Sequence, residues 1–314
     1  MRVLYHYAAG PALQRQLAAL ASAGIEVSTC SEQDDDRFFD LLPTTEVLWH
    51  CLRPVDAEVL NAAPRLRLIQ KIGVGVNTID LEAARRRGIA VCNLPGSNTR
   101  AVAEHTLGLI LAVLRRVVTF DGLLRAGEGW DRPPELEDDL GEIAGRTVGL
   151  IGYGAVPQLL APILTAMGAE VCYANRRTVP DALGEHLPLD DLLERADIIS
   201  LHLPLLPDTR HLLNAEKLQR MRRGAILINT ARGGLVDTSA LIVRLRAGHL
   251  AGAGIDVFET EPVPADDPLL TLPNVVLAPH VAWLTQETLE RSVRAAVDNC
   301  HRLATGRPLL YQIP

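Results

Sequence analysis

Three side chains with complementary acid–base and charge properties each follow a short apolar run of the sequence. They are Arg232, Glu261 and His280. A guanidinium can bind a carboxylate and polarise a ketone, and an imidazole can donate or accept the hydroxyl proton. A carboxylate beside that imidazole favours its protonated form. Each residue alone is more often structural, but together they suit hydride transfer to a 2-keto acid.

A glycine-rich turn follows a further apolar run, residues 148–152. Gly152 and Gly154 flank Tyr153, and a helical pattern begins directly after them. In a dinucleotide-binding unit the first glycine permits the tight turn, and the second lets a pyrophosphate approach the helix N-terminus. Pro157 replaces the third glycine of that pattern, so we expect a changed helix–strand contact. A plain tight turn is the alternative interpretation.

The residues after the next run bear on the choice of cofactor. An acid at this position would bind the ribose hydroxyls of NAD, but the sequence there reads Asn175, Arg176 and Arg177. Guanidinium groups pair with phosphate through a planar fork of donors. The pattern therefore favours NADP over NAD, with two solvated arginines as the alternative.

The elements that position these residues form two series of short apolar runs. Runs without polar alternation are typical of parallel strands covered on both faces, and the amphipathic segments between them read as helices. The sequence thus predicts an α/β fold. A helical pattern over 101–126 and a loop over 127–142 separate the series, and 286–304 reads as one amphipathic helix. The predicted strands are 3–7, 25–30, 46–51, 66–72 and 89–93, then 148–152, 170–175, 197–202, 225–230, 253–258 and 275–279.

Composition excludes several classes of protein. The chain has 314 residues, 48% of them hydrophobic, and a net charge of 31 − 38 = −7. This hydrophobic fraction disfavours global disorder, and the acidic balance disfavours nucleic acid and anionic membranes as partners. Five scattered cysteines without CxxC spacing predict neither a disulfide framework nor a metal site, and favour a reducing cytoplasm. We expect no signal peptide, and no apolar run reaches the roughly 20 residues of a membrane span.

Several segments together resemble the D-isomer-specific 2-hydroxyacid dehydrogenase family. They are residues 71–80 (KIGVGVNTID), 98–105 (NTRAVAEH), 201–205 with 208–210, 229–234 (NTARGG), 256–262 and 279–280. The resemblance implies that Arg232, Glu261 and His280 are catalytic. It also implies that backbone N–H groups of Val74 and Gly75 bind the substrate carboxylate. Together with the turn and the two arginines, the predicted cofactor-binding residues are Thr99, Gly152, Gly154, Ala155, Val156, Asn175, Arg176, Arg177, Thr230, Ala231, Asp256 and Trp283.

The same resemblance implies two doubly wound parallel-sheet domains. A Rossmann-type dinucleotide-binding domain, residues 99–283, would be inserted into a flavodoxin-like substrate domain, residues 1–98 and 284–314. The helical pattern over 101–126 resembles the dimer contact of the family and predicts a homodimer, although its apolar stripe could be ordinary core.

The choice of substrate is the least determined feature. Trp49, His50, Arg53 and Trp283 are candidates for reading the substrate, and Arg53 could meet a second anionic group or be a solvated loop residue. With NADP favoured, we expect reduction of a small 2-keto acid such as glyoxylate or hydroxypyruvate. The alternatives are an NAD(H)-sensing binding protein without catalysis, and a phosphite dehydrogenase on the same fold.

Overall fold

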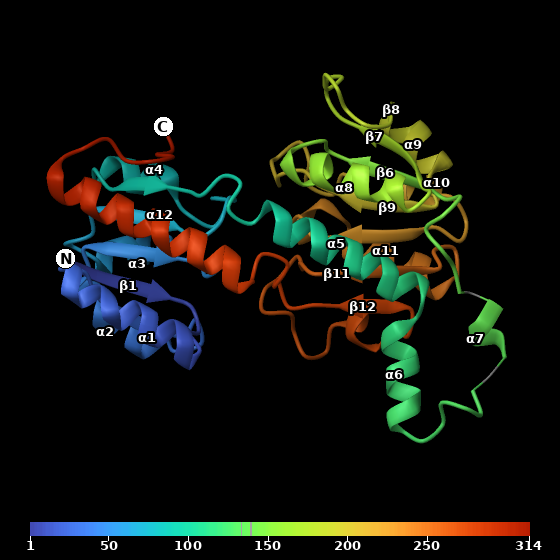
Figure 1. Ribbon diagram of the computed structural model, residues 1–314, viewed down its shortest axis with the longest axis horizontal. Helices are drawn as coiled ribbons and strands as arrows, with labels where there is room; N and C mark the ends of the chain where they lie inside the picture. Colours follow the sequence, from blue (N-terminus) through green and yellow to red (C-terminus); the bar gives the residue numbers. More distant parts are fainter. Residues whose placement is uncertain (133, 139) are drawn as a thin grey trace. The chain divides into compact units, whose positions relative to one another are not determined.

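The strands pair in parallel throughout and form two separate sheets (Figure 1). The structure is a computed structural model that describes residues 1–132, 134–138 and 140–314. The chain divides into a first unit, Met1–Asn98 with Leu284–Pro314, and a second unit, Thr99–Trp283. Both are α/β, in agreement with the fold class predicted from the apolar runs.

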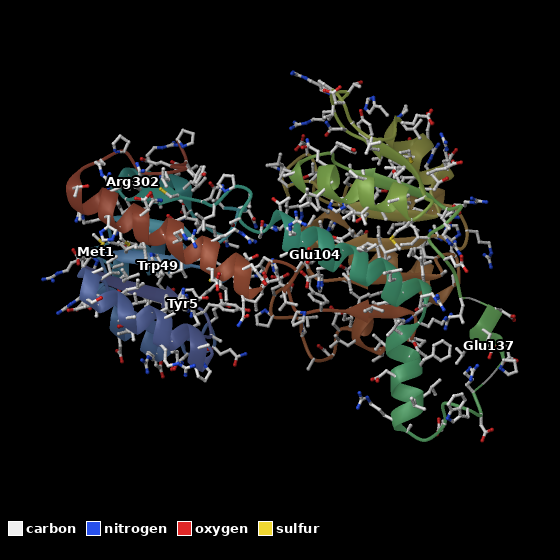
Figure 2. The ribbon with its side chains drawn as sticks, in the orientation of Figure 1. Met1, Tyr5, Trp49, Glu104, Glu137 and Arg302 are labelled. Atoms are coloured by element: carbon white, nitrogen blue, oxygen red, sulfur yellow. The ribbon has the colours of Figure 1, made fainter. Side chains whose placement is uncertain are left out.

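The sheet of the first unit has the order β2-β1-β3-β4-β5, which is the flavodoxin-like doubly wound order. Leu4, Leu48 and Ile69 contribute to a buried core together with Phe38 of a covering helix. Tyr5 and Trp49 are also fully buried (Figure 2). The strands are β1 (Arg2–His6), β2 (Glu26–Cys30), β3 (Val47–His50), β4 (Leu68–Lys71) and β5 (Ala90–Cys92).

Aspartate side chains begin several helices of this unit. The carboxylates of Asp34, Asp56 and Asp80 accept hydrogen bonds from free N–H groups in the first helical turn. The predicted amphipathic helix over 286–304 is confirmed as α12, which packs in this unit with Asn299 Nδ2 donating to Gln70 Oε1 at 2.7 Å. The helices are α1 (Pro11–Ala19), η1 (Leu20–Ala23), α2 (Asp35–Leu41), η2 (Leu42–Thr44), α3 (Ala57–Ala62), α4 (Leu81–Arg86) and α12 (Gln286–Thr305).

The sheet of the second unit has the order β12-β11-β10-β9-β6-β7-β8. The strand order reverses between β6 and β9, which is the switch point where doubly wound sheets bind ligands at the carboxyl ends of their strands. The strands are β6 (Thr147–Ile151), β7 (Glu170–Ala174), β8 (Glu185–His186), β9 (Ile198–Leu201), β10 (Ile226–Asn229), β11 (Gly252–Ile255) and β12 (Val275–Leu277). The helices are α5 (Thr99–Leu114), α6 (Val117–Arg125), α7 (Glu135–Asp138), α8 (Ala155–Ala166), α9 (Leu189–Arg195), α10 (Ala215–Arg220), η3 (Gly233–Leu235), α11 (Thr238–Arg246) and η4 (Pro268–Thr271).

Three features of the second unit differ from the sequence prediction. The helical pattern over 101–126 is two helices, because Arg116 adopts a left-handed conformation with φ 46° between α5 and α6. Strand β8 is an addition, since its two polar residues carry no apolar pattern. The predicted loop over 127–142 contains the short helix α7, and its Pro133 and Asp139 lie outside the described residues. In the described parts of the chain, every helix is too short or too polar to span a bilayer.

Candidate functional site

The glycine turn between β6 and α8 leaves a helix N-terminus open. Gly152 has φ +87°, and a Cβ built there would lie 2.5 Å from the carbonyl oxygen of His202, so glycine is required twice over. Gly154 precedes α8, and a Cβ there meets no described atom within 4 Å. Ala155 is exposed and Val156 half-buried at the start of this 12-residue helix. This open N-terminus can accept a phosphate.

Pro157 is compatible with the turn. It is the third residue of α8 and is buried. The N–H groups of the first turn of a helix have no intrahelical partner, so proline costs little there. The first described i→i−4 bond of α8 runs from Gln158 N to Gly154 O at 3.1 Å, directly after the proline. The helix therefore starts regularly despite the missing third glycine.

The loop after β7 presents two arginines to solvent. Asn175, Arg176 and Arg177 are all exposed. The loop is held from within, because Asn175 Nδ2 donates to the Arg177 carbonyl at 2.9 Å. It is also held by β8, since His186 Nε2 lies 3.0 Å from the Asn175 carbonyl oxygen. Strand β8 thus fixes the loop that lies at the carboxyl end of β7.

The Arg232 turn at the end of β10 is braced by the side chain of Asn229. Its Nδ2 donates to the Arg232 carbonyl at 2.9 Å, and its Oδ1 accepts from the Ala231 N–H at 3.1 Å. A Cβ at Gly233 would lie 1.9 Å from the carbonyl carbon of Phe258, so only glycine fits there. This close approach brings the Arg232 turn against the segment that leads to Glu261. Asn229 lies in the NTARGG motif of the sequence, but no role was predicted for it.

Thr230 lies beside this turn and is buried. Its Oγ1 lies 2.9 Å from Oγ1 of Thr106 on α5. Thr99, another predicted cofactor residue, is the first residue of α5 and is half-buried. The hydroxyl pair therefore connects the turn that carries Arg232 to the helix that begins the unit.

Glu261 and His280 form a direct hydrogen bond. Glu261 Oε2 lies 2.6 Å from His280 Nδ1, and the two side chains are 31% and 18% exposed. Glu261 Oε1 also accepts from the Phe258 N–H at 2.9 Å. Burial acts to raise the pKa of Glu261, but the hydrogen bond and charge of His280, the Phe258 N–H and the charge of Arg232 together lower it below its ordinary value. Glu261 is therefore a carboxylate at neutral pH.

Arg232 shares the electrostatic environment of this pair. Burial lowers the pKa of the Arg232 guanidinium, and the Glu261 carboxylate counteracts that shift. Because an arginine stays protonated over the whole physiological range, the site contains a fixed cation, a carboxylate and an imidazole. The structure thus brings together the three side chains predicted to be catalytic.

The backbone around His280 is held by Asp256, which follows β11 and is fully buried. Its Oδ1 accepts from the Val281 N–H at 2.9 Å and its Oδ2 from the Ala282 N–H at 3.0 Å. Its carbonyl accepts from the His280 N–H at 2.7 Å. His280 itself has φ 54°, a conformation that costs energy outside glycine. Asp256 therefore fixes a strained histidine from three directions.

Two further residues lie beside this support. His105 of α5 places Nε2 3.5 Å from Asp256 Oδ1, without a hydrogen bond between them. The Trp283 indole N–H donates to the His280 carbonyl at 3.0 Å, and the ring is buried. The family motif at residues 98–105 contains His105, but no role was predicted for it. Its position as a polar residue in the apolar pattern of α5 is the feature that could have identified it. Trp283, predicted to contact the cofactor, holds the histidine loop.

In the first unit, the loop after β4 offers backbone donors. The carbonyls of Gly73 and Val74 accept from the Leu94 N–H and from Asn93 Nδ2, both at 2.8 Å. Across residues 1–132, 134–138 and 140–314, no acceptor is found for the N–H groups of Val74 and Gly75. This fixed loop with available N–H groups can bind a carboxylate.

The residues after the third predicted strand that were candidates for substrate recognition differ in their burial and contacts. Trp49 lies inside β3 with 0% exposure, so the prediction that it reads the substrate is wrong. His50 is equally buried, and its Nε2 lies 2.5 Å from the Arg53 carbonyl. The Arg53 guanidinium forms a two-pronged ion pair with Asp35, in which Nη2 lies 3.1 Å from Oδ2. Asp35 was not singled out in the sequence.

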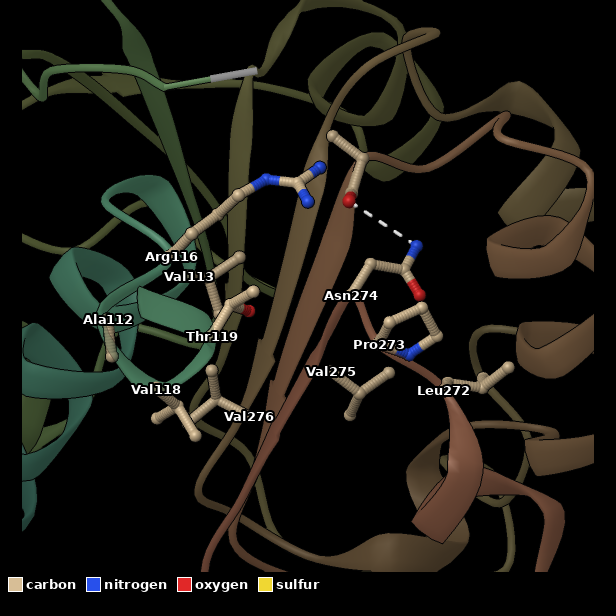
Figure 3. Close-up of a pocket in the computed structure, with 11 residues that line it drawn as sticks. Ala112, Val113, Arg116, Val118, Thr119, Leu272, Pro273, Asn274, Val275 and Val276 are labelled. Carbon is tan, nitrogen blue, oxygen red and sulfur yellow. Dashed lines mark hydrogen bonds between the residues drawn. The ribbon is translucent and has the colours of Figure 1, made fainter. Parts of the chain in front are cut away.

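A hollow in the second unit lies elsewhere. It is bordered by α5, α6 and the segments leading into β11 and β12, with Arg116, Val118 and Asn274 among its walls (Figure 3). The segments leading into β11 and β12 lie at the amino ends of these strands, whereas Arg232, Glu261 and His280 lie after the carboxyl ends of strands. The hollow is therefore at the opposite end of the strands from these three side chains. Over the described residues, no three His, Cys, Asp or Glu side chains cluster as a metal site would require.

Known proteins with similar sequences and structures identify the family of this chain. The family model "D-isomer specific 2-hydroxyacid dehydrogenase, NAD binding domain" matches residues 107–282. A glyoxylate reductase of Thermofilum pendens is 45% identical over 260 residues, 80% of this chain and 76% of its own length. A D-3-phosphoglycerate dehydrogenase of Mycobacterium leprae is 41% identical, covering 89% of this chain and 53% of its own. The crystal structure of the TT0316 protein from Thermus thermophilus covers 100% of both chains with a TM-score of 0.89 and 42% identity.

Proposed function

The chain belongs to the D-isomer-specific 2-hydroxyacid dehydrogenase family, and within that family we propose that it reduces glyoxylate or hydroxypyruvate. It is an NAD(P)-dependent oxidoreductase acting on CH–OH donors. The observation that carries the proposal is the 2.6 Å contact between Glu261 and His280, with Arg232 in the same electrostatic environment. The name of the glyoxylate reductase relatives supports the choice of substrate.

The second unit would act as the nucleotide domain and would carry the proton-transfer groups. Its Gly152–Gly154 turn and the N-terminus of α8 fit a pyrophosphate, and the bound nicotinamide supplies or accepts the hydride. Arg232 polarises the substrate carbonyl and stabilises the developing alkoxide. His280 donates the proton from Nε2 while Glu261 holds Nδ1 and stabilises the imidazolium. In the oxidation direction the neutral imidazole accepts the hydroxyl proton.

The first unit would act as the substrate domain. The N–H groups of Val74 and Gly75 are proposed to bind the substrate carboxylate. The carbonyls of Gly73 and Val74 already accept hydrogen bonds, which fix the loop and leave these N–H groups available. This assignment gives the two units the roles expected from the family: residues 1–98 with 284–314 for the substrate and 99–283 for the dinucleotide.

We propose that NADPH is preferred over NADH, because Arg176 and Arg177 are exposed at the end of β7 and residues 175–180 contain no acid. A charged hydrogen bond contributes about 1.5–3 kcal/mol, and about 1.4 kcal/mol is tenfold in affinity. The double variant Arg176→Ala/Arg177→Ala should therefore raise the KM for NADPH at least about tenfold and that for NADH less than about threefold. The matched control is Arg222→Ala/Arg223→Ala, in the loop before β10. Equal losses for both cofactors would refute the preference.

We also propose a homodimer formed through the second unit. Helix α6 exposes Val117, Val118 and Leu124, each more than half exposed, and Trp130 beyond it is 87% exposed. Such an apolar face is typical of a protein–protein contact. The hollow in Figure 3 borders the same helix at Val118. Light scattering should give a dimer mass for the parent protein and a monomer for Val118→Asp. A monomeric parent would overturn the assignment.

The redox state of the cysteines bears on the compartment. All five cysteines are free and buried. Free thiols persist in a reducing environment, and we propose the cytoplasm.

A substrate panel tests the proposed reaction. Oxidation of NADPH and NADH is followed by absorbance with glyoxylate, hydroxypyruvate, pyruvate and, in the reverse mode, phosphite. We expect the highest kcat/KM with glyoxylate or hydroxypyruvate. Tight cofactor binding without turnover of any compound would indicate a cofactor-sensing protein, and phosphite turnover alone would indicate a phosphite dehydrogenase. Either result would overturn the proposal.

A further inference from the structure

The backbone that presents Arg53 is fixed by its neighbours in the first unit. The N–H groups of Leu52 and Arg53 both donate to Glu32 Oε1, at 2.8 and 3.0 Å. The Arg53 carbonyl contacts His50 Nε2 at 2.5 Å. Arg53 therefore follows β3 in a defined loop rather than in a mobile one.

This loop lies beside the loop proposed to bind the substrate carboxylate. Strands β3 and β4 are neighbours in the sheet, and both loops leave the carboxyl ends of these strands. Val55 donates its N–H to the Thr78 carbonyl at 2.8 Å and accepts from the Asp80 N–H at 2.9 Å, which joins the two loops directly. A substrate carboxylate held at Val74 would therefore lie on the loop next to the one that carries Arg53.

The Arg53 guanidinium already has a partner of opposite charge. Nη1 and Nη2 contact the two carboxylate oxygens of Asp35, and the guanidinium carbon lies 5.1 and 5.7 Å from the ring centroids of Phe38 and Phe39. The Arg53 side chain is 21% exposed and Asp35 is 63% exposed. Burial, and then the charge of Arg53, lower the pKa of His6 to about 4, so His6 is neutral at pH 7.

An arginine with this planar fork available would bind a phosphate through two parallel hydrogen bonds. Here the guanidinium of Arg53 faces the carboxylate of Asp35, which neutralises the charge of Arg53 and repels a second anion. We propose that the Asp35–Arg53 ion pair is a specificity determinant that makes the enzyme reject 2-keto acids bearing a phosphate at the distal end. The inference rests on the proposed function and selects unphosphorylated substrates within it.

The variant Asp35→Asn removes the countercharge and leaves the shape of the side chain. We expect the ratio of kcat/KM for 3-phosphohydroxypyruvate to that for hydroxypyruvate to rise about fivefold or more, since one unit charge a few ångströms away acts on a dianion across partly solvated space. The matched control is Asp36→Asn, the next residue of α2, which is exposed and removes the same charge. Its ratio should stay within about twofold of the parent.

Four outcomes separate this inference from the proposed function. Equal ratios for the two variants, or a parent enzyme that already prefers the phosphorylated substrate, would overturn the specificity role of Asp35. The double variant Asp35→Asn/Arg53→Gln should lose the gain, and a retained gain would also overturn it. A parent without turnover of either keto acid would overturn the proposed function instead.

A binding measurement needs no turnover and checks the inference independently. Calorimetric titration with inorganic phosphate should show tighter binding to Asp35→Asn than to Asp36→Asn, and equal affinities would contradict the inference. Because Asp35 is 63% exposed, we expect both variants to fold, and thermal melting verifies this.

Discussion

Replacement of Glu261 by glutamine should shift the pH dependence of the reaction, and the structure allows the sign and size to be worked out. Glu261 Oε2 lies 2.6 Å from His280 Nδ1. The pKa of Glu261 is below its ordinary value, so its charge stabilises the imidazolium at neutral pH, and this contribution is lost only as pH falls through that lowered pKa. Glutamine keeps the shape of the side chain and removes the charge.

The magnitude follows from the separation and the exposure. Two unit charges about 4 Å apart interact by about 4 kcal/mol at an effective dielectric constant of 20 and by about 1 kcal/mol in water. Because Glu261 is 31% exposed, we expect its interaction energy with the imidazolium to be near the value in water, about 1–2 kcal/mol. At about 1.4 kcal/mol per pH unit, this corresponds to about one pH unit. Arg232 opposes the carboxylate in both proteins, so the sign of the change depends on the removed charge alone.

The assay is the pH profile of kcat/KM in both directions. Reduction needs the protonated imidazole, so its alkaline limb should move to lower pH by about one unit in Glu261→Gln. Oxidation needs the neutral imidazole, so its acidic limb should move to lower pH as well. The matched control is Glu259→Gln, which removes an equally exposed carboxylate of the same segment that pairs with His211. Unchanged limbs in Glu261→Gln, with a deuterium isotope effect showing that hydride transfer limits the rate, would refute the coupling.

Three further substitutions test separate parts of the site. His280→Ala should lower kcat by about 10²–10⁴-fold with the cofactor Kd near that of the parent, and a kcat within about threefold would remove this residue from the mechanism. Gly233→Ala should lower the free energy of unfolding by about 2 kcal/mol or more, because its methyl group would overlap the Phe258 carbonyl. Denaturant unfolding measures this, with Gly10→Ala, where the space is open, as the control. Trp283→Phe deletes the donor to the His280 carbonyl and should reduce kcat about three- to tenfold at nearly unchanged KM, whereas an unchanged kcat would show that this bond does not position the histidine.

The fold was accessible from the sequence because its strands are buried on both faces and therefore lack polar alternation. Every apolar run of the second series corresponds to a strand of the parallel sheet, and the long amphipathic pattern became α12. Strand β8 could not be found in this way, because Glu185 and His186 form a two-residue edge strand without apolar side chains. The break at Arg116 could not be predicted either, because a left-handed backbone conformation at an arginine has no sequence signature of its own.

Within the candidate site, only residues whose side-chain type the reaction itself requires could be predicted from the sequence. Arg232, Glu261 and His280 could be selected because catalysis needs those side-chain types after strand ends. The supporting role of Asp256 could not be predicted, because it joins distant segments: the sequence indicated only a cofactor contact, whereas its carboxylate accepts from the N–H groups after His280. The pairing of Asp35 with Arg53 in the first unit was hidden for the same reason. An asparagine such as Asn229 in a turn is too common to single out.

The central claim, hydride exchange with one enantiomer of a 2-hydroxy acid through His280, is tested most directly by offering both enantiomers of glycerate to the enzyme with NADP or NAD. Formation of reduced nicotinamide is followed for the parent and for His280→Ala. Rapid oxidation of D-glycerate by the parent, no oxidation of L-glycerate, and near-complete loss in His280→Ala is the predicted result. Equal oxidation of the two enantiomers, or undiminished D-glycerate oxidation in His280→Ala, would contradict the account.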